Sequence, residues 1–139
     1  DNCCFNRPFD DQRHLRIRLE AEAKLRIQEV IRDGGLQLAW SYILDFENAN
    51  NPFAERRERT RAWRTHASVD CSESAAVIAM AASFAQVGLR KVDALHVACA
   101  VHVGCAYFIT TDDHILGSAV RISEITITDP IGFIKKEMP

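Results

Sequence analysis

The stretch that decides the fold runs from Val92 to Thr128, VDALHVACAVHVGCAYFITTDDHILGSAVRISEITIT. Its first part, Val92–Val103, is almost entirely apolar and is followed by glycine, which predicts a buried helix. Two short apolar runs, Ala106–Thr111 and Ile125–Thr128, predict buried strands, and His114–Val120 predicts a helix between them. Two strands joined through a helix are typical of a parallel pair in an α/β layer.

The residues before this stretch continue the alternation. Asp11–Ile31 has apolar residues at helical spacing, and the following Asp33-Gly34-Gly35 predicts its end, with Gly34 in the left-handed conformation. Leu36–Ser41 predicts a strand buried on both faces. Tyr42–Asn50 and Phe53–Thr65 predict two further helices. The apolar stripe of the first helix consists of Leu15, Leu19, Ala23, Ile27 and Val30.

Helix-start signals mark two more elements. Asp70, with Glu73 three residues later, resembles a capping box that opens an alanine-rich helix, which Gly88 ends. Asp129-Pro130 supplies an N-cap and a first-turn proline for a last helix. Strands therefore alternate with helices along the whole chain, which predicts one α/β domain over residues 1–139 with a mainly parallel sheet.

Composition and charge exclude several classes of protein. The chain has 139 residues, of which 47% are hydrophobic and 26% charged, so a globular domain is expected. Its net charge is −2, so no overall affinity for polyanions is expected. The five cysteines form no C-x-x-C pair, and the five histidines form no H-E-x-x-H motif, which favours reduced thiols over disulfides or zinc. The polar start and the short apolar runs predict a cytoplasmic chain without membrane spans.

Four carboxylates stand where a parallel sheet presents its ligands, beyond the carboxyl ends of the strands. Asp112 closes the strand Ala106–Thr111, and Glu47 follows the strand that ends at Ser41. Asp93 lies in the first turn of an apolar helix, where burying a lone carboxylate is costly, and Asp1 opens an Asp-Asn turn. Such acids from distant segments are typical of a site for hard cations.

Each acid also has a purely structural interpretation. Asp93 is equally compatible with a carboxylate that stabilises a helix N-terminus, and Glu47 with an exposed helical residue. Of the adjacent pair, we assign Asp112 to the chemistry and Asp113 to the helix cap or an outer role, although either can be the ligand. Ser41, Thr110 and Thr111 are candidates for orienting the carboxylates.

Two motifs carry a resemblance to a known family. Lys91–Ala100 contains D-A-L-H-x-A-x-A, and Phe108–Asp112 reads apolar-apolar-T-T-D. With Asp1 and Glu47, they make the chain similar to PIN-domain ribonucleases, close to VapC-type toxins of toxin–antitoxin pairs. The resemblance implies a three-layer α/β/α fold with a central, mainly parallel sheet. It also implies an RNA substrate, and one or two Mg²⁺ or Mn²⁺ ions held by Asp1, Glu47, Asp93 and Asp112.

The chain departs from this family at its start. Family members begin with an apolar strand that leads into the first aspartate, whereas this sequence starts at Asp1, so the first strand is missing from it. The family also often has Ser or Thr after that aspartate, where this chain has Asn2. Asparagine can still hydrogen-bond a carboxylate or water.

Substrate and partners are expected at two further surfaces. The helix within Phe53–Thr65 is rich in arginine and could bind RNA phosphates while a tryptophan stacks on a base. Alternatively, it is a solvated helix face with internal Arg–Glu pairs. Its candidate RNA-binding residues are Arg56, Arg57, Arg59, Arg61, Trp63 and Arg64. Phe5, Phe9 and Trp40 are expected to border a groove open to an antitoxin or to a second copy in a homodimer.

Two other functions stay open. A catalytically silent PIN-like module would bind RNA or a protein with the same fold, although it gains nothing from clustered, mutually repelling carboxylates. A phosphatase or phosphoacceptor domain would need a lysine near its aspartates, and Lys91 lies beside Asp93 instead of ending a strand.

Overall fold

The computed structural model describes residues 1–138; Pro139, the last residue of the predicted domain, lies outside them. The strands are β1 (Leu38–Ser41), β2 (Ala67–Cys71), β3 (Tyr107–Ile109) and β4 (Thr126–Thr128). The helices are α1 (Asn2–Asn6), α2 (Leu15–Arg32), α3 (Tyr42–Ala49), α4 (Ala54–Ala62), α5 (Ala75–Gln86), α6 (Lys91–His102), α7 (Asp113–Ser118) and α8 (Pro130–Glu137). None of these helices is long and apolar enough to cross a membrane.

The strands form two separate parallel pairs. β1 pairs with β2, with Ser41 opposite Cys71, and β3 pairs with β4, with Tyr107 opposite Thr126. The predicted mixed α/β class with parallel strands is therefore confirmed. A single central sheet is not formed by residues 1–138, because a cavity of about 600 Å³, lined by β1 and β3, separates the two pairs. The three-layer arrangement around one sheet stays a prediction.

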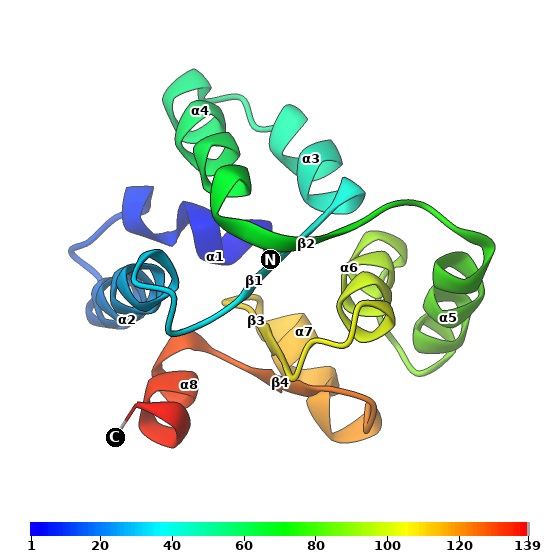
Figure 1. Cartoon of the computed structure of the whole chain (residues 1–139). Coiled ribbons are helices and arrows are strands. Elements are labelled where there is room, and N and C mark those ends of the chain that lie inside the picture. Colours follow the sequence, from blue (N-terminus) through cyan, green and yellow to red (C-terminus); the bar gives the residue numbers. More distant parts are fainter. Residues whose placement is uncertain (139) are drawn as a thin grey trace.

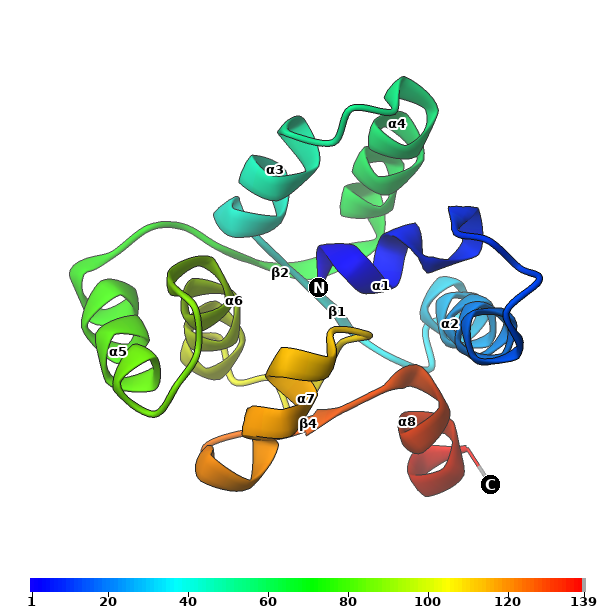
Figure 2. The ribbon, with the colours of Figure 1, turned by 180° about the vertical axis from the view of Figure 1, so that it is seen from behind.

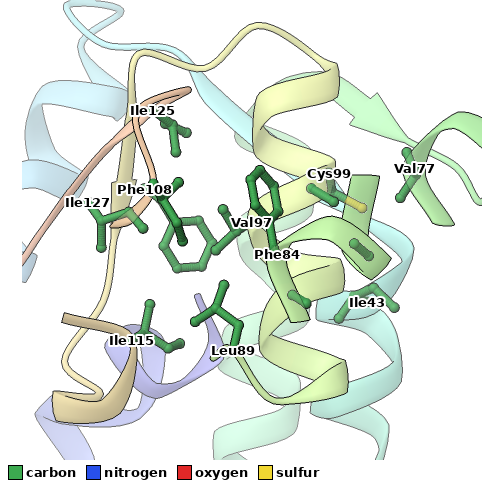
Figure 3. Close-up of a cluster of buried hydrophobic side chains, with 14 of the residues drawn as sticks. Ile43, Val77, Phe84, Leu89, Val97, Cys99, Phe108, Ile115, Ile125 and Ile127 are labelled. Carbon is green, nitrogen blue, oxygen red and sulfur yellow. The ribbon is translucent and has the colours of Figure 1, made fainter. Parts of the chain in front are cut away.

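The hydrophobic core lies around α6. Val97 and Ala98 of α6 are fully buried, and side chains from α5, from β3 and β4 and from α7 surround them (Figure 3). α5 lies along α6 in both views of the ribbon, while α2 and α8 lie together at the other side of the strands (Figures 1 and 2). The nearly continuous apolar sequence of Val92–Val103 is explained by this contact on several faces.

Several local predictions are confirmed. Gly34 and Gly104 end α2 and α6 with φ of +78° and +80°, a conformation that favours glycine. Asp129 caps α8, since its Oδ1 accepts a hydrogen bond from the Gly132 N–H at 2.6 Å. Pro130 follows in the first turn. These helix ends and caps could be predicted because they depend only on residues adjacent in the sequence.

The capping box at Asp70 was wrong. Ala67–Cys71 is the strand β2, and Asp70 accepts a hydrogen bond from Arg64 at 2.7 Å instead of capping a helix. Ser74 is the N-cap of α5, its Oγ accepting from the Val77 N–H at 3.2 Å. Three of the five residues of β2 are exposed, so its sequence, ASVDC, carries little of the apolar signal of a buried strand.

The N-terminal region also differs from its prediction. The Asp-Asn turn is a short helix, α1, and Asp1 caps it. In α2, Leu15 and Leu19 are 59% and 44% exposed, whereas Glu20 and Lys24 are buried. The apolar stripe therefore does not mark the buried face along the first half of α2.

Candidate functional site

Asp1 is held by hydrogen bonds at the carboxyl end of β3. Its amino nitrogen donates a hydrogen bond to the Ile109 carbonyl oxygen at 2.9 Å. Its carboxylate accepts one hydrogen bond from the Cys4 N–H at 3.0 Å and one from the Thr110 hydroxyl at 2.6 Å. Both carboxylate oxygens thus already have a partner, although each oxygen keeps a further lone pair.

Glu47 reaches the same end of the strands from α3. Ser41 ends β1 and caps α3, its Oγ accepting from the Leu44 N–H at 3.2 Å, so α3 begins directly at the strand end. The Glu47 carboxylate pairs with Nε2 of His96, a residue of α6 that is only 4% exposed. Burial alone would raise the pKa of Glu47, but the hydrogen bond and charge of His96 outweigh it and hold the pKa below its usual range.

Asp93 is the least satisfied of the four acids. It lies in the first turn of α6, and its Oδ2 is buried without a hydrogen-bond partner among residues 1–138. Burial raises the pKa of Asp93, and the negative charges of Asp112 and Glu47 raise it further. Three carboxylates from three elements therefore lie close enough to repel one another.

Asp112 follows β3 and caps α7. Its Oδ1 accepts from the His114 and Ile115 N–H groups at 2.8 and 3.3 Å. The Thr110 hydroxyl oxygen accepts from the Asp112 N–H at 3.1 Å, so Thr110 joins Asp112 to Asp1.

The assignment of the helix cap to Asp113 was wrong, because Asp112 makes that cap. Asp113 is exposed and forms a two-bond ion pair with Arg16 at 2.6 and 3.1 Å. The hydrogen bond from Arg16 lowers the pKa of Asp113. Thr111, the other predicted orienting residue, is 4% exposed, and its hydroxyl has no partner in the described part of the chain.

An open groove of about 760 Å³ is lined by two of the four acids, Glu47 and Asp112, and not by Asp93 or Asp1. Its lining includes Glu47 and Asp112 together with three arginines, Arg7, Arg56 and Arg90. Arg90 is exposed and makes no ion pair within the described residues, whereas Arg56 donates to the Phe9 carbonyl oxygen at 2.8 Å. Carboxylates beside arginines are suited to a phosphodiester backbone held against a cation site.

The arginine-rich helix does not present a single basic surface. Only Arg56 of its predicted RNA-binding residues lines the groove. Arg57 donates to the Asn51 carbonyl oxygen at 2.6 Å, and Arg64 pairs with Asp45 and Asp70. Arg59 and Arg61 pair with glutamates of their own helix, which agrees with the alternative of a solvated face.

The aromatic residues also lie differently from their predictions. The guanidinium of Arg32 lies 4.9 Å from the ring centre of Trp63, so that ring is already covered by a cation. Trp40 is 1% exposed and donates from Nε1 to Asp45 at 2.9 Å. Phe5 packs on Trp40 with ring centres 5.7 Å apart, and Arg56 covers Phe9. Phe5 and Trp40 line the cavity of about 600 Å³, and Phe9 does not; a groove that takes a second chain stays a prediction.

Sequence reasoning missed His96 and Cys3 as site residues. His96 stands in the D-A-L-H motif three residues after Asp93, on the adjacent turn of α6, and a period of 3.6 residues could have indicated their common face. Cys3 lines the groove together with Glu47 and Asp112. Burial raises the pKa of its thiol, and the charges of Glu47, Asp112 and Asp93 raise it further. Cys3 precedes any recognisable pattern, so the sequence carries no signal for it.

The donor chemistry of the site fits a hard cation. Oxygen ligands are those that Mg²⁺ and Mn²⁺ prefer, and the buried Oδ2 of Asp93 has no other partner. In the conformation described for residues 1–138, no three His, Cys, Asp or Glu side chains converge closely enough to hold a metal ion.

No protein-family model matches the chain, and no curated protein and no solved structure shows a significant match to it.

Proposed function

We propose that the chain is a Mg²⁺- or Mn²⁺-dependent endoribonuclease of the PIN type that hydrolyses RNA phosphodiesters. The observation that carries the proposal is Asp93, a half-buried carboxylate whose buried Oδ2 has no partner among the described residues, and whose pKa is raised by burial and by the charges of Asp112 and Glu47. Clustered repelling charges cost stability, and a divalent cation between them removes that cost.

The roles of the acids follow from their positions. Asp93, Glu47 and Asp112, with Asp1 beside them, would hold one or two ions. A bound divalent ion supplies a polarised phosphoryl oxygen and a water of lowered pKa, so that hydrolysis leaves a 5′-phosphate and a 3′-hydroxyl. The chain's own part is to orient the carboxylates. His96 holds Glu47, and Thr110 holds Asp1 and the backbone of Asp112.

Substrate binding is supported by the groove. Arg90 lines it together with Glu47 and Asp112, and its exposed guanidinium can contact a phosphate. Arg7 lines it too, but its side chain is already held by Asp10, Glu20 and the Thr111 carbonyl oxygen. The three-layer fold, a cytoplasmic toxin role with a cognate antitoxin, and a homodimer are further parts of the proposal, based on the family resemblance. A short upstream reading frame for a DNA-binding antitoxin would support the toxin role.

The alternative is a silent PIN-like module that binds RNA or protein without cleavage. The hydrogen bonds that already engage Asp1 and Glu47 favour it, since a binding site needs no free carboxylate. Mixed-sequence single-stranded RNA, incubated with the purified chain in Mg²⁺, Mn²⁺ or EDTA, separates the two functions.

The matched pair of variants for this assay is Asp93→Asn and Asp33→Asn. Both remove one negative charge with almost no change of shape, but Asp33 is exposed at the end of α2, outside the groove. We expect Asp33→Asn to cleave at the wild-type rate and Asp93→Asn to lose at least a hundredfold in rate while remaining folded. Wild-type cleavage by Asp93→Asn would exclude the metal role, and binding without cleavage by the wild type would establish the silent module.

A further inference from the structure

The loop between α3 and α4, residues 50–53, carries an exposed aromatic ring at the groove (Figure 1). All four residues of this loop line the groove, and its last residue, Phe53, is 55% exposed. Exposure alone indicates no function, because single apolar residues are common on protein surfaces. Phe46 of α3, for example, is 57% exposed and lies outside the groove. The setting of Phe53 is what distinguishes it.

The backbone that carries Phe53 is held in one conformation. The Phe53 N–H donates to Oδ1 of Asn51 at 3.0 Å, and Pro52 restricts the backbone between them. Asn51 is itself held, since its Nδ2 donates to Oδ1 of Asn6 at 2.9 Å and Arg57 donates to its carbonyl oxygen at 2.6 Å. A ring on such a loop loses little conformational freedom when a ligand covers it.

One face of the Phe53 ring is covered by a cation. The guanidinium of Arg56 lies over the ring, 4.4 Å from its centre. Arg56 is fixed in turn, because it donates to the Phe9 carbonyl oxygen at 2.8 Å and lies 3.5 Å from Asp10. The opposite face of the ring is therefore the one open to a ligand, and the positive charge behind the ring favours a ligand that carries phosphate.

A hydrogen-bonding side chain accompanies the ring. Asn50 is exposed and lines the same groove. Its Nδ2 donates to the Phe46 carbonyl oxygen at 3.0 Å, while its Oδ1 accepts no hydrogen bond within residues 1–138. Such an amide keeps an acceptor and a second N–H for a ligand. An aromatic ring with an adjacent amide is suited to an unpaired nucleobase, which is stacked on one side chain and hydrogen-bonded at its edge by another.

The loop is directly attached to the candidate site. The Asn50 N–H donates to the Glu47 carbonyl oxygen at 3.1 Å, and Phe53 follows Glu47 by six positions, a stretch that spans about 20 Å at most. Arg90 lines the same groove, is exposed and makes no ion pair within the described residues. The groove thus offers an open ring together with a free cation, which matches a base and its phosphate better than an apolar side chain of a protein.

We propose that Phe53 is a stacking platform for one unpaired nucleobase of RNA, with Asn50 beside it to bond the edge of that base. This inference rests on the proposed function and adds the class of substrate, which is single-stranded RNA. A duplex cannot use the platform, because both faces of each of its bases are covered by neighbouring bases. Phe53 takes the stacking role that the sequence indicated for Trp63, which does not line the groove.

The test measures RNA binding in EDTA, where no cleavage takes place. The probes are short single-stranded RNAs with 2-aminopurine at one position in turn, a base whose fluorescence falls when it stacks. Phe53→Leu and Phe46→Leu are the matched variants, because each removes a ring that is more than half exposed and keeps an apolar side chain. Both variants should keep the wild-type Tm for the same reason.

We expect Phe53→Leu to weaken binding about tenfold and to abolish the loss of fluorescence at the stacked position. The slope of log affinity against log salt should stay unchanged, since stacking releases no counterions. Phe46→Leu should bind like the wild type, and Phe53→Trp should retain both affinity and stacking. An RNA that lacks the base at the stacked position should bind the wild type and Phe53→Leu equally.

Equal affinity of the wild type and Phe53→Leu would overturn the proposal, and so would equal losses from the two leucine variants. The same loss with a duplex of the same sequence would show that the ring does not select an unpaired base. A wild type that binds no RNA in EDTA would also overturn it and would assign the ring to a protein partner. Failure of the nuclease proposal is distinct, because a chain that binds RNA through Phe53 and cleaves none in Mg²⁺ would refute the nuclease and keep the platform.

Discussion

The two strand pairs have interiors of opposite character. On the side of β3 and β4, the residues buried between α5, α6 and α7 are apolar; Val77 and Val97 are fully buried and Ile115 is 1% exposed. On the side of β1, the helix α2 buries Glu20, Lys24 and Gln28 and borders the 600 Å³ cavity. Both halves border this cavity, but the wall formed by α2 contributes the buried polar side chains of Lys24 and Gln28.

The two halves therefore obtain their stability from different interactions. Apolar burial contributes about 25 cal/mol for each Å² removed from water, without any requirement for a partner of defined geometry. Buried polar groups contribute only when they are paired; Gln28 Nε2 has no acceptor among the residues described, and the Lys24 amine lies over the ring of Phe5. The β1 half should therefore unfold at lower free energy than the β3 half.

The largest effect is expected from truncating a core ring. Phe84 on α5 is 4% exposed in the β3 half, and Phe84→Ala should lower the free energy of unfolding by about 3–5 kcal/mol. Phe5 already borders the cavity, so Phe5→Ala should cost only about 1–2 kcal/mol, the loss of its contacts with Trp40 and Lys24. Urea denaturation of both variants measures the difference, and equal losses would contradict the comparison.

The second effect concerns the buried amine. Burial lowers the pKa of Lys24 to about 8, so the charged form is disfavoured in the folded state. The unfolded chain then binds the proton more strongly, and stability rises with pH between the folded value and the ordinary lysine value near 10.4. Lys24→Met should stabilise the chain by about 3 kcal/mol at pH 7, and this advantage should shrink by roughly 2 kcal/mol at pH 9.5.

Lys135→Met is the matched control, because Lys135 is exposed on α8. It should change stability by less than about 0.5 kcal/mol at either pH. A Lys24→Met variant less stable than the wild type at pH 7 would show that the amine has a partner in the folded chain.

The third effect concerns the repulsion between carboxylates that belong to different halves. Glu47 belongs to the β1 half, and Asp93 and Asp112 to the other, so their repulsion acts between the halves. Because the pKa of Asp93 is raised, its ionisation costs stability increasingly as pH rises above the ordinary aspartate value. Asp93→Asn should raise the Tm at pH 7 in EDTA, and the increase should disappear as pH falls below about 4.

Mg²⁺ should also raise the Tm of the wild type. At ten times its dissociation constant the ion adds about 1.4 kcal/mol to the free energy of unfolding, and Asp93→Asn should lose this gain. Thermal denaturation with and without Mg²⁺ measures both effects. An equal Mg²⁺ response in the two proteins would place the ion outside the acid cluster.

The sequence predicted the features that depend on neighbouring residues. The β1 and β3 strands, the glycine ends of α2 and α6, and the cap at Asp129 are each encoded within a few positions. β2 was missed because its exposed face removes the apolar run that identifies a buried strand. Asp70 looked like a cap because aspartate is common at helix starts, but it lies in β2 and pairs with Arg64, six residues before it.

The site could be predicted in part. The nearness of Asp93, Asp112 and Glu47 could be predicted because strand ends and helix starts are visible in the pattern, and the charges of Asp112 and Glu47 act on Asp93. Their role as a metal site stays a prediction. The bond between His96 and Glu47 joins residues 49 positions apart, and no spacing rule relates α3 to α6. The arginine-rich helix was ambiguous in the sequence: the pairs of Arg59 and Arg61 with glutamates one turn away follow from the spacing. The bond from Arg57 to the Asn51 carbonyl oxygen and the pair of Arg64 with Asp45 depend on the folded chain.

The smallest effect expected is at the basic rim of the groove, where the halves again differ. Arg90 opens α6 in the β3 half and is free of ion pairs in residues 1–138, whereas Arg56 on α4 donates to Phe9 and faces Asp10 at 3.5 Å. A free guanidinium can turn to a phosphate, but an engaged one must first break its bonds.

Arg90→Gln should therefore weaken RNA binding about fivefold and reduce the slope of log affinity against log salt by about 0.7. Arg56→Gln should weaken binding less than twofold, and Arg26→Gln, whose side chain pairs with Glu29 outside the groove, should have no effect. Fluorescence anisotropy of a labelled single-stranded RNA in EDTA, from 50 to 200 mM salt, measures all three without cleavage. A larger loss from Arg56→Gln than from Arg90→Gln would move the RNA path onto the β1 half, since the charge that matters would then be the one that the chain already holds in place.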